Sequence, residues 1–231
     1  IRKAKMEIVE GMDTKGLLLL NGDDVLLRHL DAQPLQRITY FGRSEGCSVQ
    51  GLDVQQKEEK LSFRAEAGKL SIPVEMELEG EHYVCDALAA VAVGLKLAVP
   101  SERIGESLAT FRNLSGRQEI LKTDKYTIIK DCYNAGPESM AAALNVLGNR
   151  PGRRIAVLGD MLELGDAAWA EHYKIGRIAA EKAELVFAYG PYASRIINGT
   201  ATGGMPESKA RAYENREALV RDLKRAVKPG D

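Results

Sequence analysis

The hydrophobic positions follow one pattern in the first half of the chain and another in the second. Before residue 112, short apolar runs and partial alternation favour strands, with few helical stretches between them. They predict strands at residues 16–21, 37–41, 48–55, 60–65 and 70–78, and a helix at residues 24–30. The spacing of the last three strands is typical of hairpins. This half is therefore expected to be a mixed α/β domain.

Two further helices are expected before the pattern changes. Residues 83–97 are small and apolar all round, which predicts a helix buried between layers rather than one with a wet face. A second helix is expected at 101–111, with Ser101 as its N-cap. The stretch that follows is typical of a domain boundary, so residues 1–114 are assigned to one domain and residues 115–231 to another.

Strand and helix patterns alternate regularly after Gly116. Strands are predicted at residues 126–131, 154–158, 185–189 and 210–213, and helices at 138–147, 167–182, 193–197 and 216–227. Such alternation with short connections predicts a parallel, doubly wound sheet. Residues 228–231 form a helix-ending turn of the kind that introduces another strand, so the last strand of this sheet is expected beyond Asp231.

Composition excludes several classes of function. The 231 residues include 32 basic and 33 acidic side chains, so no net field would gather nucleic acid or an anionic membrane. No apolar run approaches the roughly 20 residues of a membrane span, and we expect a cytoplasmic protein. The three cysteines and three histidines are scattered without a CxxC pair, which argues against a disulfide framework or a structural zinc site.

The run IIKDCYNAGPESMAAALNVL, residues 128–147, takes an apolar strand through a short polar loop directly into a helix. Asp131, Tyr133 and Asn134 would lie at the carboxyl end of that strand, where open parallel sheets collect ligands, and Pro137 in the first helical turn. An ordinary strand-to-helix turn would also use Asn, Gly and Pro. Both interpretations remain open on spacing alone.

Three other patches carry candidate chemistry. GEHYVCDALAA places His82 and Asp86 at the start of a helix, where they would either cap amides or meet a ligand. SGRQEI puts Arg117 at the domain joint, either as a phosphate clamp or as a solvated linker residue. VLGDMLELG, residues 157–165, is again a strand followed by a polar loop. A phosphate-binding GxxxxGK[ST] loop and a GxGxxG fingerprint are both missing from the sequence.

In this order and spacing, the patches resemble the Mur ligase family. The resemblance covers nearly the whole chain, and two further segments take part in it, LLLLNGDDVLL and His172-x-x-x-Gly176. Its most specific part is the pairing of YNAGPESM with GDMLELG. It implies the later part of a central ATP-binding domain (1–114) joined to a carboxyl-terminal Rossmann-like ligase domain (115–231). It also implies the branch of the family that joins D-alanyl-D-alanine to UDP-N-acetylmuramoyl-tripeptide, using ATP and magnesium, in a monomeric parent enzyme.

The resemblance also suggests roles for individual residues. Arg117 matches the arginine expected near the ATP phosphates and Asp131 the aspartate near the nucleotide, and both are the expected catalytic residues. The expected ATP-binding residues are His82, Asp86, Arg117, Asp131, Tyr133 and Asn134. The amino substrate is expected beside Leu162, Glu163, Tyr189 and Tyr192. No residue of this chain matches a metal ligand of the family.

Three positions depart from the family pattern. Tyr83, Asp86 and Gly136 stand where the family usually has asparagine. A carboxylate in place of an amide changes the hydrogen bonds offered to a purine edge. Because the phosphate loop and metal ligands are missing, this chain alone is expected to be catalytically inactive. A non-catalytic nucleotide- or dipeptide-binding module of the same fold is the alternative, and a dehydrogenase-like domain is disfavoured by the missing glycine fingerprint.

Overall fold

The computed structural model describes residues 2–13, 15–28, 30 and 37–231. The chain divides into two compact units, Ile1–Arg112 and Asn113–Asp231, which are described separately below. The sequence pattern placed the boundary after residue 114.

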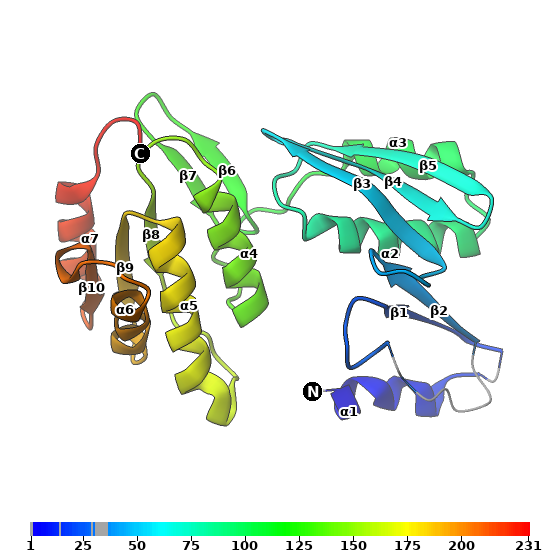
Figure 1. Ribbon diagram of the computed structural model, residues 1–231, viewed down its shortest axis with the longest axis horizontal. Helices are drawn as coiled ribbons and strands as arrows, with labels where there is room; N and C mark the ends of the chain where they lie inside the picture. Colours follow the sequence, from blue (N-terminus) through cyan, green and yellow to red (C-terminus); the bar gives the residue numbers. More distant parts are fainter. Residues whose placement is uncertain (1, 14, 29, 31–36) are drawn as a thin grey trace. The chain divides into compact units, whose positions relative to one another are not determined.

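The first unit is built around one five-stranded sheet (Figure 1). Its elements are α1 (Arg2–Met6), a 3-10 helix (Glu7–Gly11), β1 (Leu17–Asn21), β2 (Arg37–Gly42), β3 (Val49–Lys57), β4 (Lys60–Ala67), β5 (Leu70–Met76), α2 (Tyr83–Lys96) and α3 (Ser101–Thr110). The strands lie in sequence order; β1, β2 and β3 run parallel, and β3, β4 and β5 pair antiparallel. The hairpins expected from the spacing of the last three strands are therefore confirmed.

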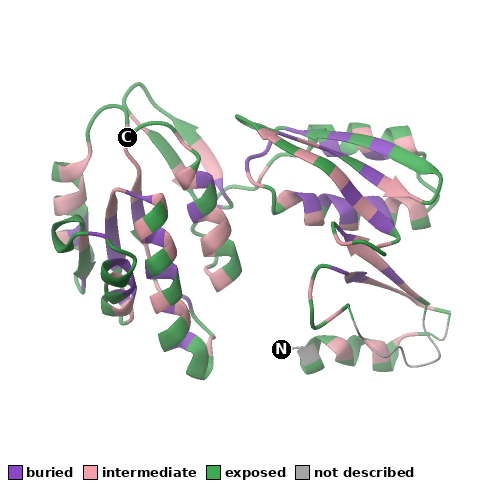
Figure 2. Ribbon diagram, viewed as in Figure 1, coloured by how far each residue is buried: buried purple, intermediate pink, exposed green. Residues whose placement is uncertain are grey.

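The core of the first unit lies between the sheet and its two longer helices. Alternate residues of β4, such as Leu61, Phe63 and Ala65, are buried against α2 and α3. The expectation that α2 is buried all round is wrong, because Asp86, Ala90 and Val93 form an exposed stripe along it (Figure 2). Small apolar side chains lie on every side of this helix. The residue types alone therefore do not show which side packs against the sheet.

Two local predictions in the first unit fail. Residues 24–30, expected to be helical, form turns in which the Asp24 carboxylate accepts a hydrogen bond from Leu26 N at 2.7 Å; residue 29 lies outside the described residues. This local side-chain bond competes with helix propagation, and the apolar Val25 side chain is 79% exposed and gains no burial. Ser101 is the first residue of α3 rather than its N-cap, and the described helix start has no side-chain cap.

The second unit contains a parallel sheet and a separate hairpin. Its elements are β6 (Glu119–Lys122), β7 (Thr127–Lys130), α4 (Pro137–Gly148), β8 (Ile155–Leu158), a 3-10 turn (Gly165–Ala167), α5 (Ala168–Lys182), β9 (Leu185–Tyr189), α6 (Ala193–Thr202), a 3-10 turn (Glu207–Lys209), β10 (Ala210–Tyr213) and α7 (Arg216–Ala226). Strands β10, β9 and β8 lie side by side and parallel, whereas β7 pairs antiparallel with β6.

Helices cover both faces of the parallel sheet. Val186 and Ala188 of β9 pack in one cluster with residues of α4, α5 and α6, while Phe187 between them packs with α7 residues such as Leu219. This is the doubly wound, Rossmann-like arrangement predicted from the alternation of elements. Residues 126–131 were expected to join the same parallel sheet. In the structure that strand, β7, is instead hydrogen-bonded within the hairpin with β6, a strand that the sequence pattern did not predict.

Helices α5 and α6 cross at a contact that requires glycine. A Cβ at Gly176 of α5 would overlap the Ile196 carbonyl oxygen and lie 2.8 Å from the carbonyl carbon. Gly199 of α6 faces it, and a Cβ there would lie 2.9 Å from the Gly176 Cα. The two helix backbones therefore touch, which fixes α5, and with it His172, one turn before Gly176, against α6.

Candidate functional site

A polar surface forms where the loop before β6 meets the loop after β7. The Arg117 guanidinium lies over the Tyr133 ring, with its central carbon 4.1 Å from the ring centroid. Both side chains are exposed, Tyr133 by 71%. A cation stacked on an aromatic face at the surface gains about 0.5–1 kcal/mol, so the pair holds the guanidinium in place without consuming its hydrogen-bond donors.

Backbone hydrogen bonds bring the two loops together. The Gly116 carbonyl accepts from Cys132 N at 2.9 Å and from Tyr133 N at 3.1 Å, and the Asp131 carboxylate accepts from Gln118 N at 3.3 Å. Gly116 and Gln118 have positive φ angles of 77° and 46°, which turn the chain sharply on each side of Arg117. The predicted residues Arg117, Asp131 and Tyr133 therefore share one surface of the second unit.

A carboxylate beneath this loop adds to its rigidity. Glu119 accepts from Gly116 N at 3.0 Å, from Ser115 Oγ at 2.8 Å and from Lys130 Nζ at 3.4 Å. The Gly116 amide and the Ser115 hydroxyl hold the pKa of the Glu119 carboxyl below its ordinary value. Glu119 is thus a fixed anion that ties the Arg117 loop to β7.

His82 and Asp86 belong to the first unit and lie at the start of α2. The His82 and Tyr83 rings are 4.1 Å apart, and no capping hydrogen bond from the His82 side chain is present at this described helix start. Desolvation raises the pKa of the Asp86 carboxyl, while His82 opposes that shift. The interpretation of His82 as a helix cap is therefore not supported. Burial of the Asp86 carboxyl disfavours its charged form.

A second polar surface of the second unit joins the loops after β8 and β9. The Asp160 carboxylate accepts from Tyr192 N at 3.1 Å. His172, fully buried, accepts from Met161 N at 2.9 Å through Nε2 and faces the Ala168 carbonyl at 2.6 Å through Nδ1. These two contacts assign the neutral tautomer with the proton on Nδ1. The His172 and Tyr192 rings stack with centroids 4.5 Å apart.

The amino-substrate residues expected from sequence lie on this second surface. Leu162 is 73% exposed, Tyr189 is 40% exposed, and Glu163 has a positive φ of 61°. The residues that hold the loops, Asp160 and His172, were present in the quoted motifs but had no predicted role. Nothing in a lone histidine eleven residues after Met161 indicates that its ring accepts a hydrogen bond from that backbone.

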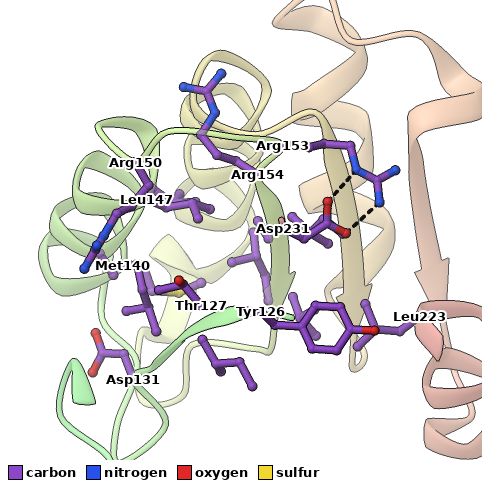
Figure 3. Close-up of a pocket in the computed structure, with 18 of the residues that line it drawn as sticks. Tyr126, Thr127, Asp131, Met140, Leu147, Arg150, Arg153, Arg154, Leu223 and Asp231 are labelled. Carbon is purple, nitrogen blue, oxygen red and sulfur yellow. Dashed lines mark hydrogen bonds and ion pairs between the residues drawn. The ribbon is translucent and has the colours of Figure 1, made fainter. Parts of the chain in front are cut away.

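The second unit also contains a cavity of about 470 Å³ that the sequence did not predict. It lies between β7 and β8, with α4 and α7 contributing to its walls (Figure 3). Asp131 and Asn134 line it, so its rim meets the polar surface that carries Arg117. Elsewhere on its lining, Arg153 forms a two-pronged ion pair with Asp231.

Among the described residues, no group of three or more His, Cys, Asp or Glu side chains is arranged to hold a metal ion. In the same described part of the chain, no helix is long and apolar enough to span a bilayer.

Comparison with known proteins identifies the family. The Mur ligase middle domain matches residues 1–94, and the glutamate ligase domain of Mur ligases matches residues 116–231. The chain belongs to the Mur ligase family. This Mur ligase chain is similar to the UDP-N-acetylmuramoyl-tripeptide–D-alanyl-D-alanine ligase of Bacillus subtilis, with 33% identity over 100% of the chain and 50% of the relative. The corresponding Escherichia coli ligase is 26% identical over 97% of the chain and 49% of the relative.

Solved structures agree with the fold of this Mur ligase chain. A crystal structure of MurF from Acinetobacter baumannii aligns with a TM-score of 0.86 and 30% identity, covering 97% of the chain and 48% of that structure. MurF from Thermotoga maritima, crystallised in complex with ADP, shares the fold with a TM-score of 0.82, 24% identity, and coverage of 100% of the chain and 52% of that structure. The chain spans about half the length of the relatives it matches.

Proposed function

We propose that this chain is part of an ATP-dependent ligase that adds D-alanyl-D-alanine to UDP-N-acetylmuramoyl-tripeptide in peptidoglycan precursor synthesis. The observation that carries the proposal is the Arg117–Tyr133 pair, held at the carboxyl end of β7 by the Gly116 backbone, in a chain similar throughout to ligases of that name. The proposal includes a cytoplasmic, monomeric parent protein that binds no nucleic acid and does not insert into a membrane.

The reaction requires positive charge where phosphate is transferred. The terminal carboxylate of the UDP-linked peptide attacks the γ-phosphorus of ATP, and ADP leaves; the amine of the dipeptide then attacks the acyl carbon, loses a proton and expels phosphate. The Arg117 guanidinium, stacked but with its edge exposed, is suited to contact phosphate oxygens. Magnesium would supply further charge when bound, but the described residues offer it no cluster of ligands.

Asp131 and the residues beside it have supporting roles in this proposal. Through Gln118 N, the Asp131 carboxylate fixes the loop that presents Arg117, and Tyr133 and Asn134 are exposed where the adenosine would lie. His82 and Asp86, at the start of α2 in the first unit, are proposed as ATP-binding residues of that unit. The Asp86 carboxylate offers a purine edge acceptor oxygens only, whereas an asparagine in its place would also donate.

The amino substrate is proposed to bind at the loops after β8 and β9. Leu162 offers an exposed apolar side chain, and Glu163 offers a carboxylate to the dipeptide ammonium group. Tyr189 ends β9 and Tyr192 lies in the loop that follows, and Asp160 joins this loop to the one after β8 through Tyr192 N. Open α/β sheets bind ligands at this edge, at the carboxyl ends of their strands.

The role of Arg117 is tested in a hybrid enzyme. The hybrid joins this chain to those parts of the Bacillus subtilis ligase that the alignment leaves uncovered. Arg117→Ala should lower kcat/KM for ATP about 10- to 150-fold, the equivalent of about 1.5–3 kcal/mol for a lost hydrogen bond to a charged group. Arg117→Lys should recover part of the lost kcat/KM, because lysine keeps the positive charge but lacks the two parallel N–H donors of the guanidinium.

Arg211→Ala is the matched control, because Arg211 is also an exposed arginine near a tyrosine ring, 5.2 Å from the Tyr213 centroid. It should leave kcat/KM unchanged. Equal effects of the two alanine variants would contradict the proposed role of Arg117.

The exposed Arg117–Tyr133 pair would also suit a second candidate, a non-catalytic nucleotide- or dipeptide-binding module of the same fold. Titration calorimetry of the chain alone with ATP and with D-alanyl-D-alanine distinguishes the two. A severed part of an enzyme should give no heat of binding at micromolar concentrations. Micromolar affinity for either ligand would support the module instead.

A further inference from the structure

Arg195 lies in a part of the second unit that is otherwise acidic. The loop after β8 and the first turn of α5, residues 159–171, contain four acidic side chains and no lysine or arginine. The loop after β9 and the first turn of α6, residues 190–195, contain one charged side chain, Arg195. Both loops follow the carboxyl ends of parallel strands, so Arg195 supplies these two loops with their cation at the edge where the amino substrate is proposed to bind.

Aromatic rings of α5 hold the Arg195 guanidinium. Its central carbon lies 3.8 Å from the centroid of the Trp169 ring and 5.6 Å from the centroid of the Tyr173 ring. Helices α5 and α6 lie side by side, and Trp169 is 55% exposed, so the stack is open to solvent (Figure 1). A guanidinium stacked on a ring keeps its in-plane N–H donors for a planar pair of oxygens.

The charge of Arg195 is not neutralised by any residue that the structure describes. Within that part of the chain, its Nε is buried without a hydrogen-bond partner, and no carboxylate forms an ion pair with the guanidinium. Glu171, the acidic side chain in the first turn of α5, pairs with Lys174 at 2.6 Å instead. Arg195 also lies in the first turn of α6, where the helix dipole opposes a positive charge. Neither an ion pair nor helix stability therefore accounts for a cation at this position.

Arg195 is close to a residue already proposed for the amino substrate. Tyr192 precedes α6, and its carbonyl accepts from Arg195 N at 2.9 Å, which places the two residues in the same turn. The Tyr192 ring stacks on His172 at 4.5 Å, and His172 lies between Trp169 and Tyr173 in the sequence of α5. Tyr192 and Arg195 therefore contact the same end of α5.

We propose that Arg195 binds the terminal carboxylate of the amino substrate, with the Trp169 ring holding the guanidinium in place. This inference rests on the proposed ligase function, in which Glu163 contacts the ammonium group of the dipeptide and its carboxylate has no assigned partner. An extended dipeptide spans about 7 Å, so residues of different loops can contact its two ends. Parallel N–H donors of a guanidinium bind both carboxylate oxygens, and the enzyme therefore selects a dipeptide with a free carboxylate.

The hybrid enzyme tests this contact with two compounds, D-alanyl-D-alanine and D-alanyl-D-alaninamide, which lacks the negative charge. The unmodified hybrid should have a kcat/KM for the amide about 10- to 100-fold lower, the effect of losing a hydrogen bond between charged groups. Arg195→Ala should lower kcat/KM for the dipeptide by a similar factor, mainly through KM, and leave kcat/KM for the amide nearly unchanged. Equal losses for the two compounds would show that Arg195 only packs α6 against α5 and would refute the proposal.

Two further variants separate this contact from a general effect of charge. Arg177 is an exposed arginine of α5, one turn beyond Tyr173, and Arg177→Ala should leave the preference for the dipeptide over the amide unchanged. Arg195→Lys should recover part of the preference, because lysine keeps the charge without the two parallel donors. A loss of preference in Arg177→Ala as large as in Arg195→Ala would contradict the specific role of Arg195.

The single tryptophan gives a measurement that does not depend on ligase activity. Because Arg195 stacks on Trp169, millimolar D-alanyl-D-alanine should change the fluorescence of this chain saturably, and the amide should not; Arg195→Ala should abolish the response. An inactive hybrid with this response would refute the ligase function and support the Arg195 contact. An active hybrid that uses the dipeptide and the amide equally would refute the contact and support the ligase function. An inactive hybrid without a Trp169 response would overturn both.

Discussion

Replacing Gly176 with alanine is expected to destabilise the second unit despite the higher helix propensity of alanine. The new methyl group would overlap the Ile196 carbonyl oxygen, and the nearest further atoms are also backbone, which cannot move aside as a flexible side chain can. Overpacking of this kind costs about 3 kcal/mol, and the gain in helix propensity offsets about 1 kcal/mol. The net loss should be about 2 kcal/mol.

The single tryptophan, Trp169 in α5, lets urea unfolding of the second unit be followed by its fluorescence. With an m-value of about 2 kcal/mol/M, the midpoint should fall by about 1 M or slightly more. Gly159→Ala is the matched control, since a Cβ there meets nothing within 4 Å, and its midpoint should stay the same or rise slightly. A Gly176→Ala protein as stable as the control would refute the close backbone contact of α5 with α6.

Two further predictions concern the second unit. His172→Ala should cost about 2–4 kcal/mol in the same fluorescence assay, because it leaves a cavity and removes the acceptor of Met161 N; a loss below about 0.5 kcal/mol would show that the ring does not hold the loop. Asp231→Asn should lower the free energy of unfolding at pH 7 and make that free energy less dependent on pH in the acid range. Arg153 lowers the folded-state pKa of Asp231, so this stabilisation is present above about pH 4 and disappears as the pH falls through the folded pKa. Identical acid-unfolding curves for Asp231→Asn and the parent chain would contradict that coupling.

The regular alternation of the second half made its fold predictable from sequence. Strands such as β8 and β9 are short apolar runs between clear helices, and their burial on both faces leaves a continuous hydrophobic signal. The hairpin strand β6 was missed because its four residues, Glu119–Lys122, mix charged and apolar side chains with no surrounding pattern. Its position depends on pairing with β7, a contact the local sequence does not encode.

The first unit illustrates where pattern reasoning fails. Val25 and Leu26 supplied apolar positions for a helix, but neither reaches a core, and Asp24 satisfies the local backbone instead. Conversely, α2 looked buried all round because alanine and valine occupy the stripe through Ala90 that is exposed in this structure. Hydrophobicity indicates that a residue can be buried, whereas the neighbouring elements decide whether it is.

Site residues were predictable only where a family motif identified them. The motif placed Arg117, Asp131 and Tyr133 in the same region, and the structure brings their loops together through Gly116. It gave no indication that Arg117 stacks on Tyr133 or that His172 accepts from Met161 N. Those contacts depend on loop conformations with positive φ angles and on the α5–α6 crossing, which are tertiary properties.

The central claim is tested most directly by the product that the hybrid ligase forms. Incubated with ATP, UDP-N-acetylmuramoyl-tripeptide and D-alanyl-D-alanine, the hybrid should yield the UDP-linked pentapeptide, detected by mass spectrometry with equimolar phosphate, and this chain alone should yield neither. A well-folded hybrid that binds ATP but forms no pentapeptide, or phosphate release by the chain alone, would contradict the account.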